Sequence, residues 1–354
     1  MTSALDAEPR PSSASAMDPA PRRTISSFLL RGSTQVGLFL ILVVLWAVFA
    51  NLAPGFLSKF NLNSLLRSVA VDIVVGFAQM VVLATGGMNL SVGAIGVCAV
   101  MFSGYLMQVL GLPIPVAIAG TLALGAFLGW LNGFAIVKTG VNSFVVTLAS
   151  ASLFSGGMLI LTKAVPLNGL PPEFGAFGKS AVGPAIGSIP AIPSLAVVAL
   201  AIGLGLYLLF KHSTLGRQIL AVGANARAAE MSGIPVDRTI VFVHALSGAL
   251  AAAAALMLTA RLAAAMPAVA GDDWLLPSFL APVIGGTALS GGIVSVVGTI
   301  LGALLVSTIR SGLLVLEIGN FWLPLFLGAF LLAAILIERG RAAYVAREQA
   351  RRAL

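Results

Sequence analysis

Residues 190–210 read PAIPSLAVVALAIGLGLYLLF, an apolar stretch without a single charged side chain. An α-helix needs about 20 such residues to cross the ~30 Å hydrocarbon core of a bilayer. Along a run of this length in lipid, a helix satisfies all of its own backbone hydrogen bonds. The stretch therefore predicts a transmembrane helix.

Similar stretches recur on both sides of this one. They cover residues 34–53, 64–86, 91–110, 113–137, 143–163, 190–210, 238–260, 274–290, 293–316 and 320–338. The pattern predicts an all-α polytopic membrane protein with about ten transmembrane helices. The segment 274–290 is short and is interrupted by Pro277 and Pro282, so its ends are the least defined.

The composition agrees with a membrane protein. Of the 354 residues, 59% are hydrophobic and only 9% are charged, and the mean hydropathy is +1.05. A soluble domain carries about a quarter charged residues. The chain has one cysteine, Cys98, which excludes a disulfide framework or a cysteine-rich metal site within one chain.

The basic residues predict orientation rather than nucleic-acid binding, because they lie between the apolar segments and at the two ends. With both termini inside, 14 of the 20 basic residues are cytoplasmic: Arg10, Arg22, Arg23, Arg31, Lys138, Lys211, Arg217, Arg227, Arg238, Arg339, Arg341, Arg347, Arg351 and Arg352. The others are Lys59, Arg67, Lys163, Lys179 and Arg261 outside or near the outer boundary, and Arg310 within a span. This bias predicts an N-in, C-in protein.

The chain divides into three parts on this interpretation. Residues 1–33, rich in Ala, Pro, Ser and Arg, are expected to form a disordered cytoplasmic tail. Residues 34–338 form the transmembrane domain, and 339–354 a basic cytoplasmic tail. Within the domain, 164–189 is rich in proline and predicts an irregular external loop.

The largest internal loop, residues 211–237, is the most informative segment. Asn225 is a good N-cap and Gly233 a good C-terminal stop for a helix of about two turns. That helix places Arg227 and Glu230 three residues apart on one face. It is too short to be stable alone, so it either lies on the membrane as a connector or docks against a partner.

The chain contains no motif of an energy-converting enzyme. The segment Phe177–Ser180 ends like a phosphate-binding loop, but Glu173 stands where that motif needs a glycine. No zinc-protease motif or nucleophile elbow is present, and His212 and His244 are isolated. We therefore expect a non-enzymatic chain that binds no metal or cofactor.

Three ordered motifs resemble one family. They are Gly86-Gly87-Met88-Asn89-Leu90-Ser91-Val92-Gly93, the run from Gly216 to Gly233, and Ala260-Arg261-Leu262 to Pro267 with Ile284-Gly285-Gly286-Thr287-Ala288-Leu289-Ser290-Gly291-Gly292. Their order and spacing are similar to those of ribose-type (carbohydrate uptake) ABC transporter permeases, from about residue 40 to 338.

The resemblance implies the ABC importer permease fold in a bacterial inner membrane, and import of a small polar solute such as ribose or a related sugar. It also implies a second permease subunit in a homodimer or heterodimer, ATPase domains on separate chains that use ATP, and a periplasmic solute-binding protein. The residues matching the family's coupling loop, and therefore expected to contact the ATPase, are Gly223, Asn225, Arg227, Glu230 and Gly233.

Polar residues within the spans are candidates for the solute path. Asn89 interrupts an apolar stretch beside glycines, where non-helical backbone is tolerated only if it is buried or lines a cavity. Its neutral amide either bonds solute hydroxyls or joins two helices. Gln79, Asn132, Asn142 and Asp72 have the same two interpretations.

Glycines spaced by four residues predict close helix packing. Gly125, Gly129 and Gly133 form one such face, and Gly298 with Gly302 another.

Two departures from the family leave the exact solute open. Leu275 and Pro277 stand where many relatives have an acidic pair, and Asn89 stands where an aspartate is commoner. The alternatives are a branched-chain amino acid, a nucleoside or a signalling molecule as the solute, or a secondary transporter. The lack of a clear intramembrane ion pair argues mildly against an amino acid, and a secondary transporter usually needs intramembrane carboxylates.

Overall fold

The computed structural model describes residues 25–183, 191–268 and 270–318, together with positions 322, 324–326, 328–329 and 332. Its helices and strands are, in order, α1 (Ile25–Leu52), α2 (Lys59–Leu83), α3 (Val92–Gly104), the π-helix η1 (Tyr105–Val109), α4 (Ile114–Thr139), α5 (Ser143–Thr162), α6 (Pro172–Lys179), β1 (Ala181–Val182), β2 (Ile192–Pro193), α7 (Ser194–His212), α8 (Thr214–Ala224), α9 (Ala226–Met231), α10 (Val236–Leu262), α11 (Asp272–Ile284) and α12 (Val296–Val315). The predicted all-α polytopic fold is confirmed.

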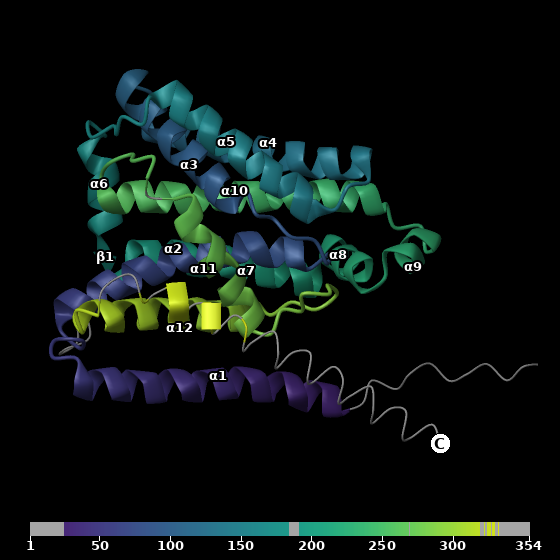
Figure 1. Cartoon of the computed structure of the whole chain (residues 1–354), viewed down its shortest axis with the longest axis horizontal. Coiled ribbons are helices and arrows are strands. Elements are labelled where there is room, and N and C mark those ends of the chain that lie inside the picture. Colours follow the sequence, from purple (N-terminus) through teal and green to yellow (C-terminus); the bar gives the residue numbers. More distant parts are fainter. Residues whose placement is uncertain are drawn as a thin grey trace, which may run out of the picture.

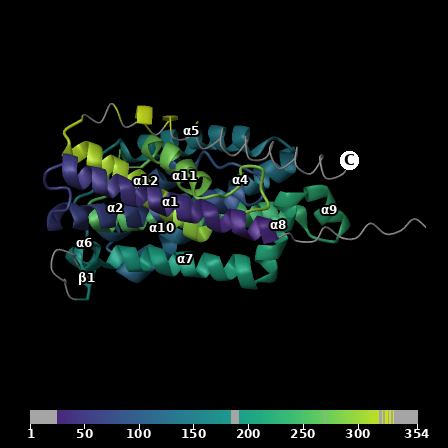
Figure 2. The same cartoon turned by 90° about the horizontal axis from the view of Figure 1, so that it is seen from below.

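The long helices run side by side along the molecule, which has two distinct ends (Figures 1 and 2). One end carries α6 and the β1–β2 pair and is called the α6 end. The other carries α8 and α9 and is called the α9 end. Helix α1 lies on one side of the bundle, next to α12, and α4 and α5 lie on the opposite side (Figure 1).

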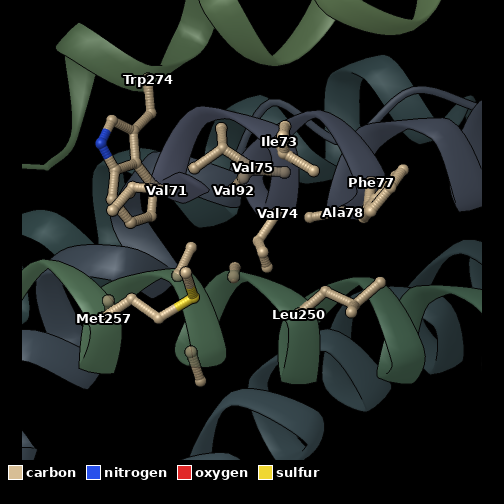
Figure 3. Close-up of a cluster of buried hydrophobic side chains, with 14 of the residues drawn as sticks. Val71, Ile73, Val74, Val75, Phe77, Ala78, Val92, Leu250, Met257 and Trp274 are labelled. Carbon is tan, nitrogen blue, oxygen red and sulfur yellow. The ribbon is translucent and has the colours of Figure 1, made fainter. Parts of the chain in front are cut away.

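Helix α2 is the centre of the bundle, since it packs against α7, α10, α11 and α12. Residues 69–83 of α2 are all buried and, apart from Asp72 and Gln79, carry no charged or amide side chain, as expected of a helix surrounded by other helices. Figure 3 shows Val74 and Phe77 of α2 packed toward Leu250 and Met257 of α10, with Trp274 of α11 beside them. This layer is the main core of the molecule.

The two predicted glycine faces are confirmed as close helix contacts. A Cβ added to Gly129 would lie 2.1 Å from the carbonyl oxygen of His244 on α10, and one added to Gly125 would lie 2.4 Å from that of Gly248. On α12, a Cβ at Gly298 would lie 1.8 Å from the carbonyl oxygen of Gly285. Backbones this close leave no room for a side chain. In lipid no hydrophobic effect drives helices together, so the van der Waals contact that glycine allows holds these helices against each other.

Eight helices of the described residues are long and apolar enough to cross a membrane. Helix α11 is shorter than predicted: it has 13 residues and spans about 20 Å. It ends at Ile284 because residues 285–295 form a glycine-rich loop with positive φ at Gly286, Gly291 and Gly292. The predicted span 320–338 lies mostly outside the described residues.

Two segments differ in detail from the sequence-based expectation. Helix α1 begins at Ile25, inside the segment 1–33 that was expected to be a tail, because apolar residues already start there. The loop 164–189 contains α6, and β1 pairs with β2 in an antiparallel register of Ala181 with Pro193.

Candidate solute path and coupling site

The segment between α2 and α3, residues 84–91, is a non-helical loop inside the bundle. Asn89 in this loop is 0% exposed. Its Oδ1 accepts hydrogen bonds from the Ser91 backbone N–H at 3.0 Å and the Ser91 hydroxyl at 2.7 Å, and its Nδ2 donates to the Ser247 hydroxyl at 3.0 Å. The amide therefore fixes the start of α3 and joins it to α10.

Two further amides complete this arrangement. In the orientation of the Gln79 amide that satisfies both of its polar atoms, the nitrogen donates to the Asn89 carbonyl oxygen at 2.9 Å and the oxygen accepts from the Asn89 backbone N–H at 3.3 Å. Asn132 of α4 donates to the Ser91 hydroxyl at 2.7 Å, and the Ser247 hydroxyl donates to the Ala78 carbonyl oxygen at 2.6 Å. We call these side chains the polar network: Gln79, Asn89, Ser91, Asn132 and Ser247.

Three of the five predicted path residues thus meet in one place. Gln79, Asn89 and Asn132 are each at most 1% exposed, so in this conformation they face one another. The Asn132 Oδ1 is buried and has no hydrogen-bond partner among the described residues. Asn142 lies elsewhere: it is exposed and caps α5 by accepting from the Phe144 N–H at 2.8 Å.

The sequence analysis did not identify the residues of α5 that hold the loop. The Ser143 hydroxyl accepts from the Met88 N–H, and the Thr147 hydroxyl accepts from the Leu90 N–H, each at 3.0 Å. Ser91 and Ser247 of the network were also missed. Serine and threonine in apolar helices commonly bond their own backbone, so their presence alone gave no signal.

The loop 84–91 touches two other segments through backbone alone. A Cβ added to Gly223, near the end of α8, would lie 1.9 Å from the Ala84 carbonyl oxygen, and one added to Gly291 would lie 2.6 Å from the Gly86 backbone nitrogen. The Gly292 N–H donates to the Ala84 carbonyl oxygen at 3.0 Å. We call this contact the glycine junction: Gly86, Gly223, Gly291 and Gly292.

The predicted helix of the internal loop is present as α9, with both of its predicted ends. The Asn225 side chain accepts from the Ala228 N–H at 3.0 Å. Gly233 has a φ of +80° and its N–H bonds the Glu230 carbonyl oxygen. Arg227 and Glu230 are exposed, and Met231 is 85% exposed. The helix therefore presents a charged and apolar surface at the α9 end.

Helix α8 was not predicted. Its signals were a cap at Ser213, whose hydroxyl accepts from the Gly216 N–H at 2.9 Å, and apolar residues at Leu215, Ile219 and Val222. Ile219 and Val222 are buried, and α8 leads directly from α7 to Gly223. It connects the exposed α9 to the glycine junction.

Two further observations concern charge and metals. Asp72 and Arg310 form an ion pair at 3.7 Å, which corrects the expectation that no clear intramembrane pair exists. The sequence could not show it, because the two residues lie on α2 and α12. Within the part of the chain that the structure describes, no group of three or more His, Cys, Asp or Glu side chains could hold a metal ion.

Comparison with known proteins places these features in context. Residues 61–336 match the family described as branched-chain amino acid transport system / permease component. Ribose import permease protein RbsC of Bacillus subtilis (strain 168) is 36% identical over 87% of this chain and 94% of its own length.

Two other relatives have different solutes in their names. D-allose transport system permease protein AlsC of Escherichia coli (strain K12) is 31% identical over 86% of this chain and 91% of its own length. Autoinducer 2 import system permease protein LsrD of Salmonella paratyphi B is 34% identical over 90% of this chain and 94% of its own length. No solved structure matches the chain.

Proposed function

The chain belongs to the family of branched-chain amino acid transport system permease components, and on that basis we propose that it is the membrane subunit of an ATP-driven sugar importer. Two of the three relatives compared above are named for the sugars ribose and allose. The neutral amides and hydroxyls of the polar network suit a solute rich in hydroxyl groups, because such pairs form hydrogen bonds without burying a charge.

We place the α9 end in the cytoplasm and the α6 end on the outer side. Helix α1 begins at the α9 end, and the sequence before it carries Arg10, Arg22 and Arg23. Elements at the same end carry five more basic residues: Lys138, Lys211, Arg217, Arg227 and Arg238. Cytoplasmic loops carry the excess of basic residues. In this orientation α9 faces a cytoplasmic ATPase, which binds and hydrolyses the ATP. A solute-binding protein delivers the solute to the α6 end, and a second permease subunit completes the path.

The glycine junction carries this proposal. Docking of the ATPase on α9 displaces α8, and α8 bears Gly223 directly against the Ala84 carbonyl oxygen. Because no side chain lies between these backbones, a shift of α8 is transmitted to loop 84–91 without being absorbed by rotamer changes. The loop contains Asn89, so the same movement opens the polar network.

In the open network, the side chains of Gln79, Asn89 and Asn132 exchange their bonds within the network for bonds with solute hydroxyls. Closure restores the bonds between side chains and releases the solute. This accounts for buried amides that bond serine hydroxyls of the network in the described conformation.

The solute is identified by a panel in proteoliposomes containing the chain, its ATPase and its binding protein, loaded with ATP. We expect accumulation of labelled D-ribose or D-allose above that of L-leucine. Accumulation of L-leucine alone would assign the chain to amino acid transport, consistent with the name of its family. Failure to accumulate any of the three solutes would exclude the sugar assignment for this panel.

A further inference from the structure

A charged cluster lies between α2, α10 and α12, apart from the polar network. At its centre is the buried carboxylate of Asp72, whose Oδ2 accepts from the Ser307 hydroxyl at 2.6 Å and pairs with Arg310 at 3.7 Å. The Arg310 side chain is 36% exposed, whereas that of Asp72 is 9% exposed. In this pair the cationic side chain is therefore the more exposed of the two.

Two more arginines belong to this cluster. Arg261, at the end of α10, interacts electrostatically with Asp72, Arg67 and Arg310. Arg67 donates from one terminal nitrogen to the Lys179 carbonyl oxygen of α6. Its Nε is buried and has no hydrogen-bond partner among the described residues. All three arginines are partly exposed.

The charges in this cluster do not balance. Arg310 pairs with Asp72 at 3.7 Å, and Arg261 is attracted by Asp72 and repelled by Arg67 and Arg310, so the cluster contains three guanidinium groups and one carboxylate. Cations this close repel one another, and the repulsion is strong where water is scarce. A second negative group would relieve it, and guanidinium groups bind carboxylates and phosphates through paired N–H donors.

The charged cluster and the polar network lie on the same faces of α2 and α10. Asp72 and Gln79 are seven residues apart on α2, hence on one face and about 10 Å apart along the helix axis. Arg261 and Ser247 are fourteen residues apart on α10, again close to one face. On both helices the charged cluster is therefore nearer the α6 end and the polar network nearer the α9 end.

We propose that Arg67, Arg261 and Arg310 bind an anionic oxygen group of the solute, a carboxylate or a phosphate ester, before the solute reaches the polar network. This rests on the proposed function and extends its substrate class to sugars that carry an acidic group. Asp72 attracts the guanidinium groups of Arg310 and Arg261, and the Lys179 carbonyl oxygen holds that of Arg67. The three guanidinium groups are therefore in place before the anion arrives.

The test is binding of D-ribonate to the full chain in phosphatidylcholine nanodiscs, measured by calorimetry at constant ionic strength. We expect D-ribonate to bind more tightly than neutral D-ribose. Arg310→Gln and Arg67→Gln should each weaken D-ribonate binding about tenfold, the usual scale for one charged hydrogen bond. Lys163→Gln is the control, because it removes one exposed positive charge at the α6 end outside the cluster.

Three results would overturn the proposal. They are no D-ribonate binding by the wild type, equal affinity in all variants that elute as folded monodisperse protein, or displacement of all D-ribonate by phosphatidylglycerol at a few lipids per disc. The last result would assign the cluster to a lipid headgroup. ATP-driven uptake of D-ribose, measured in the same preparation of the complex, tests the proposed function separately, since it does not need the cluster to bind an anion.

Discussion

The side chain of Asn89 makes three hydrogen bonds in a fully buried position, two with Ser91 at the start of α3 and one with Ser247 of α10. Residue type predicted that Asn89, Gln79 and Asn132 would be important, because amides are costly in a membrane unless they are paired. The bonds from Asn89 to Ser247 and from Asn132 to Ser91 were not predictable, since they join α10 and α4 to the loop across long sequence separations. Asn142 was selected by the same reasoning and is only a helix cap.

Replacement of Asn89 by leucine should destabilise the protein more than replacement of Asn142 by alanine. Asn89→Leu leaves the Ser91 N–H and hydroxyl without their acceptor, at about 1–3 kcal/mol for each buried group, whereas loss of a helix cap costs about 1 kcal/mol. Thermal unfolding of the detergent-solubilised chain measures the difference. Equal unfolding temperatures would show that the network is not a structural contact.

The glycine junction gives a second prediction at this scale. Gly223→Ala introduces a Cβ at 1.9 Å from the Ala84 carbonyl oxygen, so α8 and the loop must separate. We expect a loss of about 1–3 kcal/mol, as for other overpacked sites, and loss of transport. Gly156→Ala is the control, because no heavy atom lies within 4 Å of its added Cβ. Wild-type stability and uptake in Gly223→Ala would contradict the close contact.

At the scale of elements, α9 was predictable because its signals are local. The side chain of Asn225, the left-handed Gly233 and the alanines between them lie within nine residues. The end of α11 and the presence of α8 were harder to predict from the sequence. Helix α11 ends where Gly285 and Gly286 begin a glycine-rich loop, but no local pattern reports the packing of that loop against residues 84–91 and α8.

Charge reversal on α9 tests whether it is a docking element. Arg227→Glu or Glu230→Arg should leave the chain folded, because both side chains are exposed, but should abolish coupling through like-charge contact with the ATPase, which costs several kcal/mol. Solute uptake and ATP hydrolysis in the reconstituted complex are the measurements. Lys163→Glu, at the α6 end, should leave both unchanged. If the α9 variants also retain both, α9 is only a connector.

A related prediction concerns Gly233, the left-handed residue that ends α9. Gly233 has a φ of +80°, a conformation that a β-branched residue adopts only with strain. We expect Gly233→Val to reduce uptake as strongly as the charge reversals, and Gly233→Asn to reduce it less, because asparagine tolerates this region. Equal uptake by both variants would show that the end of α9 has no role in coupling.

At the scale of the whole molecule, the membrane fold followed from apolar run lengths, and α2, α4, α5, α7, α10 and α12 match predicted spans within a few residues. The central position of α2 and the charged cluster did not follow, because helix neighbours are set by packing in three dimensions. Run lengths also do not distinguish a full span from the short α11.

Orientation is the whole-molecule prediction. Cys98 is buried, so a Cys98→Ala background provides a chain without cysteine for labelling. A cysteine at Glu173 on α6 should react with an impermeant maleimide from outside, and one at Ser232 beside α9 should react only after the cells are opened. A reporter fused after Arg341 should be cytoplasmic. Labelling of both cysteines from the same side would contradict the proposed orientation.

The central claim is that this chain moves a solute by using ATP hydrolysed on a partner chain. The most direct measurement is simultaneous recording of D-ribose accumulation and ATP hydrolysis in proteoliposomes containing the chain, its ATPase and its binding protein. We predict accumulation only when ATP is present on the ATPase side, hydrolysis stimulated by the loaded binding protein, and no uptake driven by a proton or sodium gradient alone. Uptake driven by such a gradient in the absence of ATP would contradict the account and make the chain a secondary transporter.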